Sequence, residues 1–354
     1  MNAALLALVG NTPLTRITAP LPLPHAGFWA KLEGLQAGGM KARAAVSMLR
    51  AARARGELRP GDTVVESTSG TLGIGLAFAG QALGHPVVLV VDAELEPEMR
   101  AMLTAYGARL EVVTRPHAVG GWQQARLDRL GNLLRDIPGA FWPDQYGNPD
   151  NPAGYAGLAR ELVAALDGLD VLVCSVGTGG HSSGVVHELR CHWPDLRLIG
   201  VDTVNSAIFG RRPGTRLMRG LGSGIHPRNV AYRQFDEVHW IGPAEAADTC
   251  RRLAAHAFVT GGWSTGAVAR VAAWVARTEA GARVAAVFPD GPHRYAHSIY
   301  DDAYCRHHGL FGSTAQHPVE IASPRAAASA TWARCGAVTD PLDPAPAVHH
   351  GAPA

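Results

Sequence analysis

The sequence predicts an α/β protein whose parallel sheets are covered by helices on both faces, and three observations support this prediction. Apolar runs rich in β-branched residues recur along the chain and alternate with alanine- and leucine-rich segments at helical spacing. These runs are continuously apolar, which is typical of parallel strands buried on both faces. With 354 residues, the chain exceeds the size at which one core grows efficiently, so we expect two domains with a cleft between them.

The elements follow from the same pattern. Each continuous apolar run predicts a strand, and these runs lie at residues 28–33, 62–67, 86–92, 109–114, 170–176, 196–202, 238–242 and 284–290. Glycine, acidic residues or proline open the helical segments, which predicts helices over 70–84, 95–106 and 152–166. From 312 to 354 the pattern gives way to alanine, proline, serine and histidine, which predicts a disordered tail.

Charge and cysteine content restrict the partners and the compartment. The chain has 32 basic and 30 acidic residues, so it has no electrostatic footprint for nucleic acid or an anionic membrane. No apolar run approaches the roughly 18 residues of a membrane span. The five cysteines are scattered without a C-x-x-C pair, so neither a disulfide framework nor a zinc site is expected. These features predict a cytoplasmic protein with small-molecule partners.

The histidines do not predict a metal site either. His181, His187 and His192 follow one another at spacings of six and five, which do not place three ligands on one helical face. We therefore expect no bound metal.

Lysine is rare in this chain, and one lysine has a chemically suggestive position. Only Lys31 and Lys41 are lysines among the 32 basic residues; codon bias explains the scarcity but not the two positions. Lys41 follows a glycine pair and begins a helix, at the edge where open α/β sheets bind ligands. A cation at a helix start is unfavourable, which favours a lowered pKa and a reactive neutral amine. From this segment alone, a solvated surface lysine is an equally good interpretation.

Two glycine-rich segments, residues 66–77 and 174–184, each leave a strand and enter a helix. Backbone N–H groups converge at such a helix start and bind carboxylate or phosphate. Neither segment has a Walker lysine, the G-x-G-x-x-G dinucleotide pattern or the G-x-S-x-G elbow of hydrolases. Two anion-binding loops and one amine match the requirements of pyridoxal phosphate (PLP), which needs sites for its phosphate, its aldehyde and the substrate carboxylate.

These segments resemble the cysteine synthase and cystathionine β-synthase family of fold type II PLP enzymes, in order, over about residues 8 to 310. The similar motifs are GNTPL (10–14), LEGLQAGGMKAR (32–43), ESTSGTLGIGLAF (66–78), QYGNPDN (145–151), VGTGG (176–180), RGLGSGIHP (219–227) and GGWSTGA (261–267). The resemblance implies a tryptophan synthase β-like fold with two open twisted sheets and flanking helices, and a homodimer. It also implies a larger domain from residues 1–41 and 146–311, with residues 42–145 as a smaller nested domain.

The resemblance also implies the roles of the site residues. Lys41 would hold PLP as a Schiff base and remove the α-proton of the substrate. The phosphate would be held by the segment Gly177, Thr178, Gly179, Gly180 and His181. The substrate carboxylate would be bound by Thr68, Ser69, Gly70, Thr71 and Gln145.

The chain departs from the family pattern at several of these positions. Met40 alone separates the glycine pair from Lys41, where the family has two residues. Thr71 replaces the asparagine that meets the 3′-hydroxyl of the cofactor, and His181 replaces the last threonine of the phosphate segment. Gly291 stands where a serine faces the pyridine nitrogen, which leaves that nitrogen to water or to Asp290.

The implied function is PLP-dependent β-replacement on O-acetyl- or O-phospho-L-serine through an aminoacrylate, which gives cysteine or another β-substituted alanine. Arg219 lies where relatives that use O-phosphoserine carry an arginine nearby, so it is a candidate for binding the leaving group; a structural ion pair is the alternative. Two other functions remain open, β-elimination to a keto acid and a non-catalytic, regulatory role in binding PLP or an amino acid.

Overall fold

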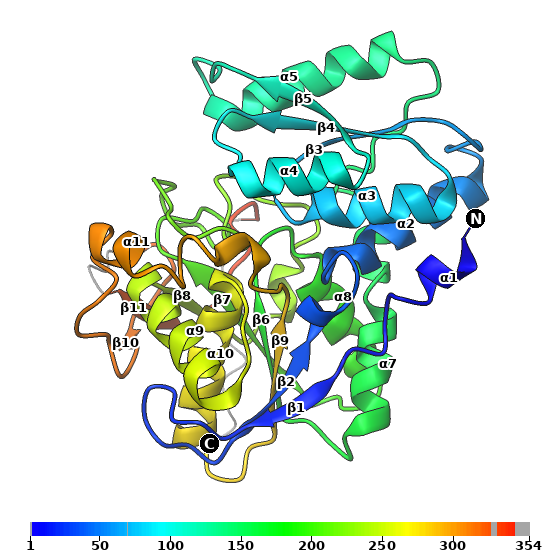
Figure 1. Ribbon diagram of the computed structural model, residues 1–354. Coiled ribbons are helices and arrows are strands. Elements are labelled where there is room, and N and C mark those ends of the chain that lie inside the picture. Colours follow the sequence, from blue (N-terminus) through cyan, green and yellow to red (C-terminus); the bar gives the residue numbers. More distant parts are fainter. Residues whose placement is uncertain (1, 69, 327–330, 344–354) are drawn as a thin grey trace.

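The computed structural model describes residues 2–68, 70–326 and 331–343. In these residues the chain forms two sheets with helices on both faces, so the predicted α/β fold is confirmed (Figure 1). The larger sheet has the strand order β1 (Leu14–Ile17), β2 (Phe28–Leu32), β9 (Val284–Phe288), β6 (Val171–Ser175), β7 (Arg197–Thr203), β8 (Glu237–Ile241), β11 (Trp332–Cys335) and β10 (Val319–Glu320). The smaller sheet has the order β3 (Val64–Ser67), β4 (Val87–Asp92) and β5 (Arg109–Val113).

Each of the predicted apolar runs forms a strand, and these strands are the parallel part of both sheets. In the larger sheet β2, β9, β6, β7 and β8 run parallel, and β1 and β11 add antiparallel strands at either side. The strands of the smaller sheet are all parallel. Parallel strands covered on both faces have no side open to water, which explains their continuous apolar sequences.

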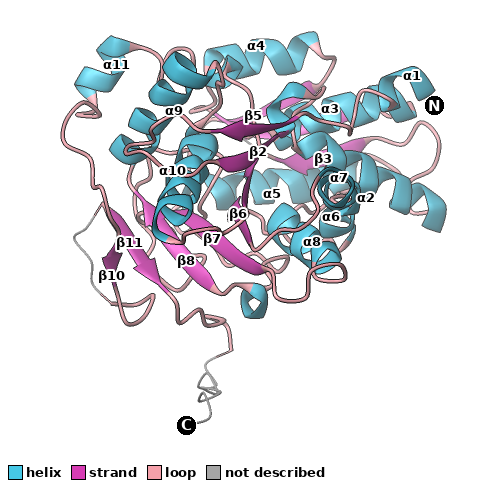
Figure 2. Ribbon diagram, turned by 90° about the horizontal axis from the view of Figure 1, so that it is seen from below, coloured by secondary structure: helices cyan, strands magenta, loops and turns pink. Residues whose placement is uncertain are grey.

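The helices cover both faces of both sheets (Figures 1 and 2). They are α1 (Ala3–Leu6), α2 (Lys41–Arg55), α3 (Leu72–Leu83), α4 (Pro97–Ala105), α5 (Gly121–Asp136), α6 (Asp150–Ala153), α7 (Ala156–Ala165), α8 (Gly180–Leu189), α9 (Pro243–Ala257), α10 (Trp263–Thr278) and α11 (Asp302–His307). The smaller sheet and α3, α4 and α5 fall within residues 42–145. The domain boundaries themselves stay a prediction. None of the helices in the described ranges is both long and apolar enough to cross a bilayer.

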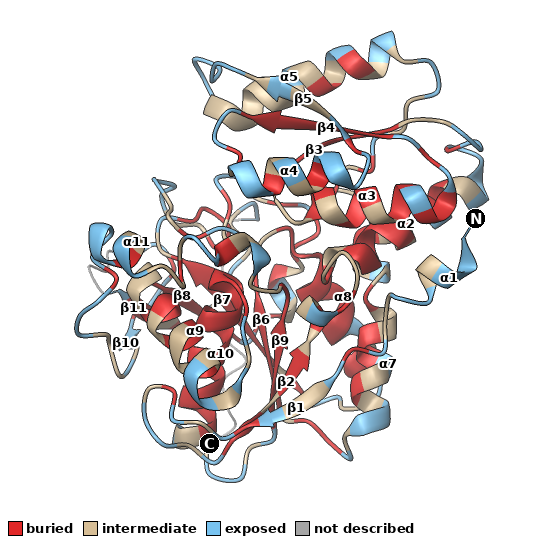
Figure 3. Ribbon diagram, viewed as in Figure 1, coloured by how far each residue is buried: buried red, intermediate tan, exposed pale blue. Residues whose placement is uncertain are grey.

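Strand β6 shows how the larger sheet separates two cores. Its residues Val171 and Val173 pack in one apolar cluster with the side chains of α10, whereas Leu172 and Cys174 pack in another with α8. Successive side chains of a strand point to opposite faces, so one continuous apolar run serves both cores. Figure 3 shows the result, with central strands buried throughout and α4 and α11 largely exposed.

The helix predicted over 152–166 is instead two helices, α6 and α7, which meet at Gly154 and Tyr155. Gly154 lies directly against α2, and a Cβ atom there would be 2.8 Å from the carbonyl oxygen of Arg43. The helix break therefore follows from a close approach between backbones, which helical spacing in the sequence does not encode.

The prediction of a disordered tail is wrong for the described residues after 312. Strand β11 pairs antiparallel with β8, and β10 pairs parallel with β11. The side chain of Trp332 is fully buried, and its indole Nε1 donates to Nδ1 of His239 at 2.9 Å. An apolar strand thus covers the edge of the larger sheet that β8 would otherwise expose.

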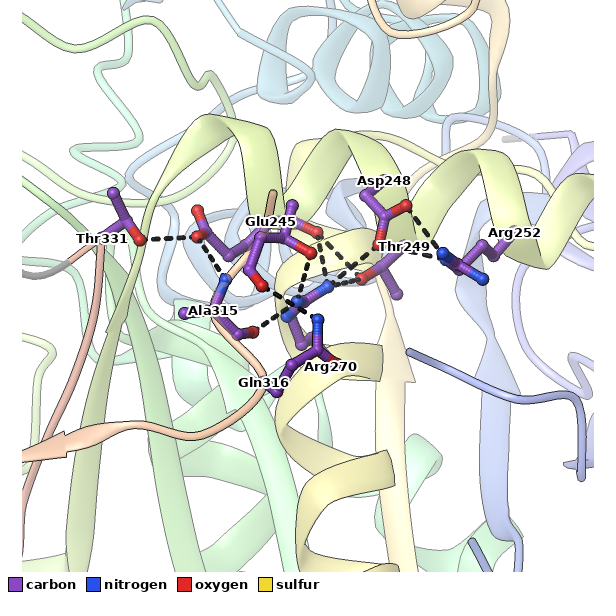
Figure 4. A network of polar contacts seen from close by, with 9 residues as sticks. Glu245, Asp248, Thr249, Arg252, Arg270, Ala315, Gln316 and Thr331 are labelled. Carbon is purple, nitrogen blue, oxygen red and sulfur yellow. Dashed lines mark hydrogen bonds and ion pairs between the residues drawn. The ribbon is translucent and has the colours of Figure 1, made fainter. Parts of the chain in front are cut away.

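A buried arginine fastens this tail to the helices, as Figure 4 shows. The guanidinium of Arg270, in α10, donates to Thr314 Oγ1 at 2.8 Å and to the carbonyl oxygen of Ala315 at 2.5 Å. Glu245, in α9, accepts from Thr331 Oγ1 at 2.6 Å. Polar groups of the tail therefore supply hydrogen-bond partners to side chains that α9 and α10 bury, which the composition of the tail did not indicate.

Candidate functional site

A cavity of about 710 Å³ opens at the carboxyl ends of the strands, between the smaller and the larger sheet. Its walls come from the start of α2, the segment after β3, the segment 142–146, the segment after β6 and the segment 214–228. Ligands of open α/β sheets bind at this edge. The cavity therefore brings together most of the segments that the sequence singled out.

Lys41 lies in this cavity at the first position of α2, as predicted. Its Nζ is 3.4 Å from the hydroxyl of Thr178. Burial lowers the pKa of its amine to about 8, because the charged form loses its hydration. At neutral pH a useful fraction of the amine is consequently neutral and nucleophilic.

Lys31, the other lysine, has a structural position. Its buried Nζ lies 2.6 Å from Glu161 Oε2 and donates to the carbonyl oxygen of Thr12 at 2.6 Å. Arg43, two residues after Lys41, pairs with both Glu33 and Glu161 at distances of 2.7 to 2.9 Å. Two cations and two anions balance in this buried group, which fixes α2 against β2 and α7.

The proposed phosphate segment surrounds the first turn of α8. Gly177, Thr178 and His181 line the cavity, while Gly179 and Gly180 lie behind them and supply backbone at the helix start. Gly179 has φ +84°, and a Cβ atom there would be 2.6 Å from the carbonyl oxygen of Asn229. Such a turn needs glycine and aims its N–H groups at one point.

The structure explains one departure from the family pattern, the histidine at position 181. Its ring is buried, and its Nε2 has no hydrogen-bond partner among the described residues. Burial, with a smaller contribution from the charge of Lys41, lowers the pKa of the imidazole to about 3, so the ring stays neutral. A neutral imidazole beside a helix start can donate one N–H to a phosphate oxygen, so these residues fit the cofactor.

The proposed carboxylate loop occupies the facing wall. Thr68, Gly70 and Thr71 all line the cavity, and Thr68 Oγ1 accepts from the backbone N–H of Gly70 at 3.1 Å. Thr71 directly precedes α3, which begins at Leu72, and its side chain makes no capping hydrogen bond. Ser69 lies outside the described residues.

Gln145 lines the same cavity, and its backbone forms three hydrogen bonds with side chains. Its N–H donates to Glu66 Oε2 at 3.2 Å, and its carbonyl oxygen accepts from Asn151 at 2.6 Å and Asn229 at 3.0 Å. Glu66 Oε1 also accepts from the indole Nε1 of Trp142 at 3.0 Å. Glu66 thus ties the carboxylate loop to Gln145, a role that the sequence analysis missed although Glu66 lies in the ESTSG motif.

The remaining predicted residues are less central. Arg219 lines the mouth of the cavity with an exposed side chain, 3.8 Å from Glu94. Asp290 and Gly291 are not on the cavity wall. The buried carboxylate of Asp290 accepts from the hydroxyl of Tyr295 and from the N–H of Gly262 at 3.2 Å. The contact of Asp290 or Gly291 with the pyridine nitrogen stays a prediction.

The structure also adds cavity residues to which the sequence analysis assigned no role. Arg126 and Trp122 reach the cavity from α5, Arg216 reaches it from a loop, and Tyr146 lies in the QYGNPDN segment beside Gln145. Helical spacing marks α5 as amphipathic but does not say which of its faces meets a cavity. The described residues contain no group of three or more His, Cys, Asp or Glu side chains that could hold a metal ion.

Comparison with known proteins agrees with this geometry. The family model described as pyridoxal-phosphate dependent enzyme matches residues 5–290. The N-(2-amino-2-carboxyethyl)-L-glutamate synthase of Ralstonia nicotianae is 36% identical over 320 residues, which cover 89% of this chain and 94% of that protein.

Solved structures give the same result. The crystal structure of O-ureido-L-serine synthase matches with a TM-score of 0.76 and 31% identity, covering 84% of this chain and 95% of that one. The O-acetylserine dependent cystathionine β-synthase from Helicobacter pylori matches with a TM-score of 0.77 and 29% identity, covering 84% and 98%. A cavity lined by a buried lysine, a fold match over 84% of the chain and a family match over most of the sequence agree: the chain belongs to the pyridoxal-phosphate dependent enzymes.

Proposed function

We propose that this enzyme catalyses β-replacement on an O-activated L-serine, either O-acetyl- or O-phosphoserine. The observation that carries the proposal is the position of the Lys41 amine, in one cavity between the phosphate segment of α8 and the carboxylate loop before α3. An amine between two anion-binding loops is what an amino-acid substrate and PLP together require.

The residues of the cavity have separate roles in the proposed reaction. Lys41 would hold PLP through its aldehyde until the amino group of the donor displaces the lysine amine, and the bound cofactor would then supply the electron sink that stabilises negative charge at the α-carbon of the donor. The loop with Thr68 and Gly70, together with Gln145, holds the donor carboxylate. The amine of Lys41 takes the proton from the α-carbon and later returns it.

Bond making and breaking are then confined to the β-carbon. The C–O bond of the donor breaks, and acetate or phosphate leaves with the electron pair. The acceptor forms a new bond to the same carbon and loses one proton. Arg219, at the mouth of the cavity, is the proposed partner of the departing anion.

We further propose that the acceptor is the amine of an amino acid. The product named for the Ralstonia relative is a glutamate whose nitrogen carries a three-carbon amino-acid unit. That unit corresponds to the carbon skeleton of serine. Other solved relatives are named for O-ureidoserine, for cystathionine and as a sulfhydrylase, so sulfide and thiols are the alternative acceptors, with cysteine as one product.

The test is product analysis by mass spectrometry on the holoenzyme. It should be given each serine donor with glutamate, sulfide or homocysteine in turn. A donor-dependent adduct of glutamate is the expected result. Release of pyruvate and ammonia without an adduct would show β-elimination instead, and absence of any donor consumption would refute catalysis on these donors.

A homodimer in the cytoplasm is also proposed. All five cysteines are free in the structure, which suits a reducing compartment. Light scattering on the purified protein would measure the mass of the assembly, and a mass near that of one chain would exclude the dimer.

A further inference from the structure

The arginines that line the cavity differ from one another in how their charge is compensated. Among the described residues, five guanidiniums reach the cavity wall, and four of them have a carboxylate partner. The pairs are Arg126 with Asp92, Arg219 with Glu94 at 3.8 Å, Arg228 with Asp144 at 2.9 Å and Arg294 with Glu96 at 2.9 Å. The fifth guanidinium belongs to Arg216.

Arg216 forms no ion pair with any described residue. Its Nη1 donates to the carbonyl oxygen of Asn205 at 3.4 Å, a long hydrogen bond to a neutral acceptor. The side chain is partly buried, and burial lowers the pKa of its guanidinium. A cation that gives up water without a counter-ion raises the free energy of the protein, unless a bound anion compensates it.

One protein carboxylate acts on Arg216 but does not provide that compensation in full. Asp202 acts on Arg216 electrostatically, but burial raises the pKa of Asp202 to about 7. Near neutral pH its carboxyl group is therefore only partly ionised. The charge of Arg216 remains available to a ligand in the cavity.

We propose that Arg216 binds a carboxylate of the acceptor amino acid and so selects the second substrate. This inference rests on the proposed β-replacement. The donor carboxylate already has the loop with Thr68 and Gly70, and the phosphate of the cofactor has the start of α8. Arg216 lies on a different wall, in the segment 214–228. A guanidinium binds a carboxylate with two parallel hydrogen bonds.

The experiment compares holoenzymes carrying Arg216→Gln, Arg216→Lys and, as a matched control, Arg212→Gln. Arg212 lies four residues earlier on the same loop, is exposed and does not line the cavity. Two quantities are measured for each protein. The first is the change in cofactor absorbance when donor is added alone, and the second is the initial rate as a function of glutamate concentration.

Arg216→Gln is expected to raise the KM for glutamate by about 10- to 100-fold, the loss of a charged hydrogen bond, while the donor-only absorbance change stays as in the parent. Arg216→Lys should recover part of the loss, and Arg212→Gln should match the parent. Glutamine and glutamate α-amide as acceptors identify the carboxylate: the acceptor that lacks it shows the same KM in parent and variant.

Two results would overturn the inference. One is a parental KM for glutamate in Arg216→Gln. The other is a donor-only absorbance change that is impaired as much as turnover, which would assign Arg216 to the donor or to the fold. If the melting temperature of Arg216→Gln lies well below that of the parent, the KM for glutamate is compared between the parent and Arg216→Lys instead. Lysine keeps the positive charge but cannot form two parallel hydrogen bonds to a carboxylate. A parent enzyme that does not respond to either donor would refute the proposed function, and this inference with it.

Discussion

The Nζ atom of Lys41 lies 3.4 Å from Oγ1 of Thr178, across the cavity that separates the start of α2 from the start of α8. The two residues come from strand-to-helix turns 137 positions apart in the sequence. Their proximity means that the aldehyde and the phosphate of one cofactor can reach an amine and a helix start at the same time.

Cofactor attachment should depend on pH through the amine of Lys41. Because its pKa is lowered to about 8, the rate of PLP attachment to apoprotein should rise about tenfold per pH unit below 8 and level off above it. Stopped-flow absorbance between pH 6 and 9.5 measures this rate. Lys41→Ala is the control and should show no covalent adduct by mass after borohydride reduction; a rate that does not change with pH would contradict the assignment.

His181 should contribute to cofactor affinity equally at all physiological pH values. The imidazole is neutral above a pKa of about 3, so it donates a hydrogen bond without changing charge. His181→Ala should weaken PLP binding by about tenfold, one hydrogen bond to an anion. Equilibrium dialysis at pH 6 and pH 8 measures the dissociation constant. A large difference between the two pH values for the ratio of parent to variant would argue against a neutral donor.

Lys31 should be essential for stability. Lys31→Met removes one cation from a balanced buried group and leaves a net negative charge, so it should lower the free energy of unfolding by about 3 kcal/mol. Although burial opposes it, hydrogen bonds from Arg43 and Lys31 lower the pKa of Glu161 to about 2. The stabilisation by Glu161 is therefore present above pH 4.5 and is lost as the pH falls toward 2.

Urea unfolding at pH 7 and at lower pH measures both effects. Arg55→Gln is the matched control, because Arg55 belongs to exposed ion pairs with Glu57 and Asp150 and should cost less than about 1 kcal/mol. Equal losses of unfolding free energy for the two variants would mean that burial of the charged group around Lys31 does not contribute to stability.

Glu66 should reduce stability as the pH rises toward neutrality. Burial raises the pKa of its carboxyl group to about 7, above its usual value of 4.5, so the unfolded chain binds fewer protons between these two values. Stability that is present below pH 4.5 is then lost as the pH rises to 7, by an amount on the order of 3 kcal/mol.

Melting temperatures between pH 5 and 8 test this dependence. Glu66→Gln should have a flatter profile than the parent, with some slope left by Asp202, whose pKa is also raised to about 7. Glu57→Gln, at an exposed carboxylate, should keep the parental profile over this range. Glu66→Gln should also raise the KM for the donor, because the amide cannot accept from Gln145 and Trp142 together.

Trp332 should be a stability determinant although it lies in the tail. Trp332→Ala empties a fully buried site beside Trp274 and His239 and should cost about 3 to 5 kcal/mol. Denaturant unfolding measures the change. Phe258→Ala, at a side chain with 98% exposure, should change stability by less than about 0.5 kcal/mol and serves as the control.

The sequence predicted the parallel strands and the position of Lys41 at a helix start well because both depend on local pattern. Continuous apolar runs mark strands such as β6, and a glycine pair before Lys41 marks a strand-to-helix turn. The prediction for the tail was wrong for the opposite reason, because its structure depends on residues far away in the sequence. Strand β11 is a short segment that pairs with β8 and contacts Arg270 through Trp332, about 95 and 60 residues away, and no local pattern reports such a partner.

The site shows the same division. Glycine-rich turns could be predicted, whereas Arg126 and Arg216 reach the cavity only through the packing of α5 and of a loop. Glu66 was within a recognised motif, but its bridge to Gln145 joins segments 79 residues apart. Residue types in the sequence suggest which chemistry is possible, and the fold determines which of those residues lie together in one site.

The scarcity of lysine has a practical consequence for anyone who wishes to label this protein. Acylating reagents attack neutral amines that they can reach. Lys31 is enclosed with Glu161 and Arg43, whereas Lys41 faces an open cavity and is partly deprotonated near neutrality. Apart from the chain terminus, a reactive ester added to apoprotein should therefore attach a dye at one side chain, and bound cofactor should block that attachment. The amount of dye attached to the protein would therefore measure the fraction of active sites without cofactor.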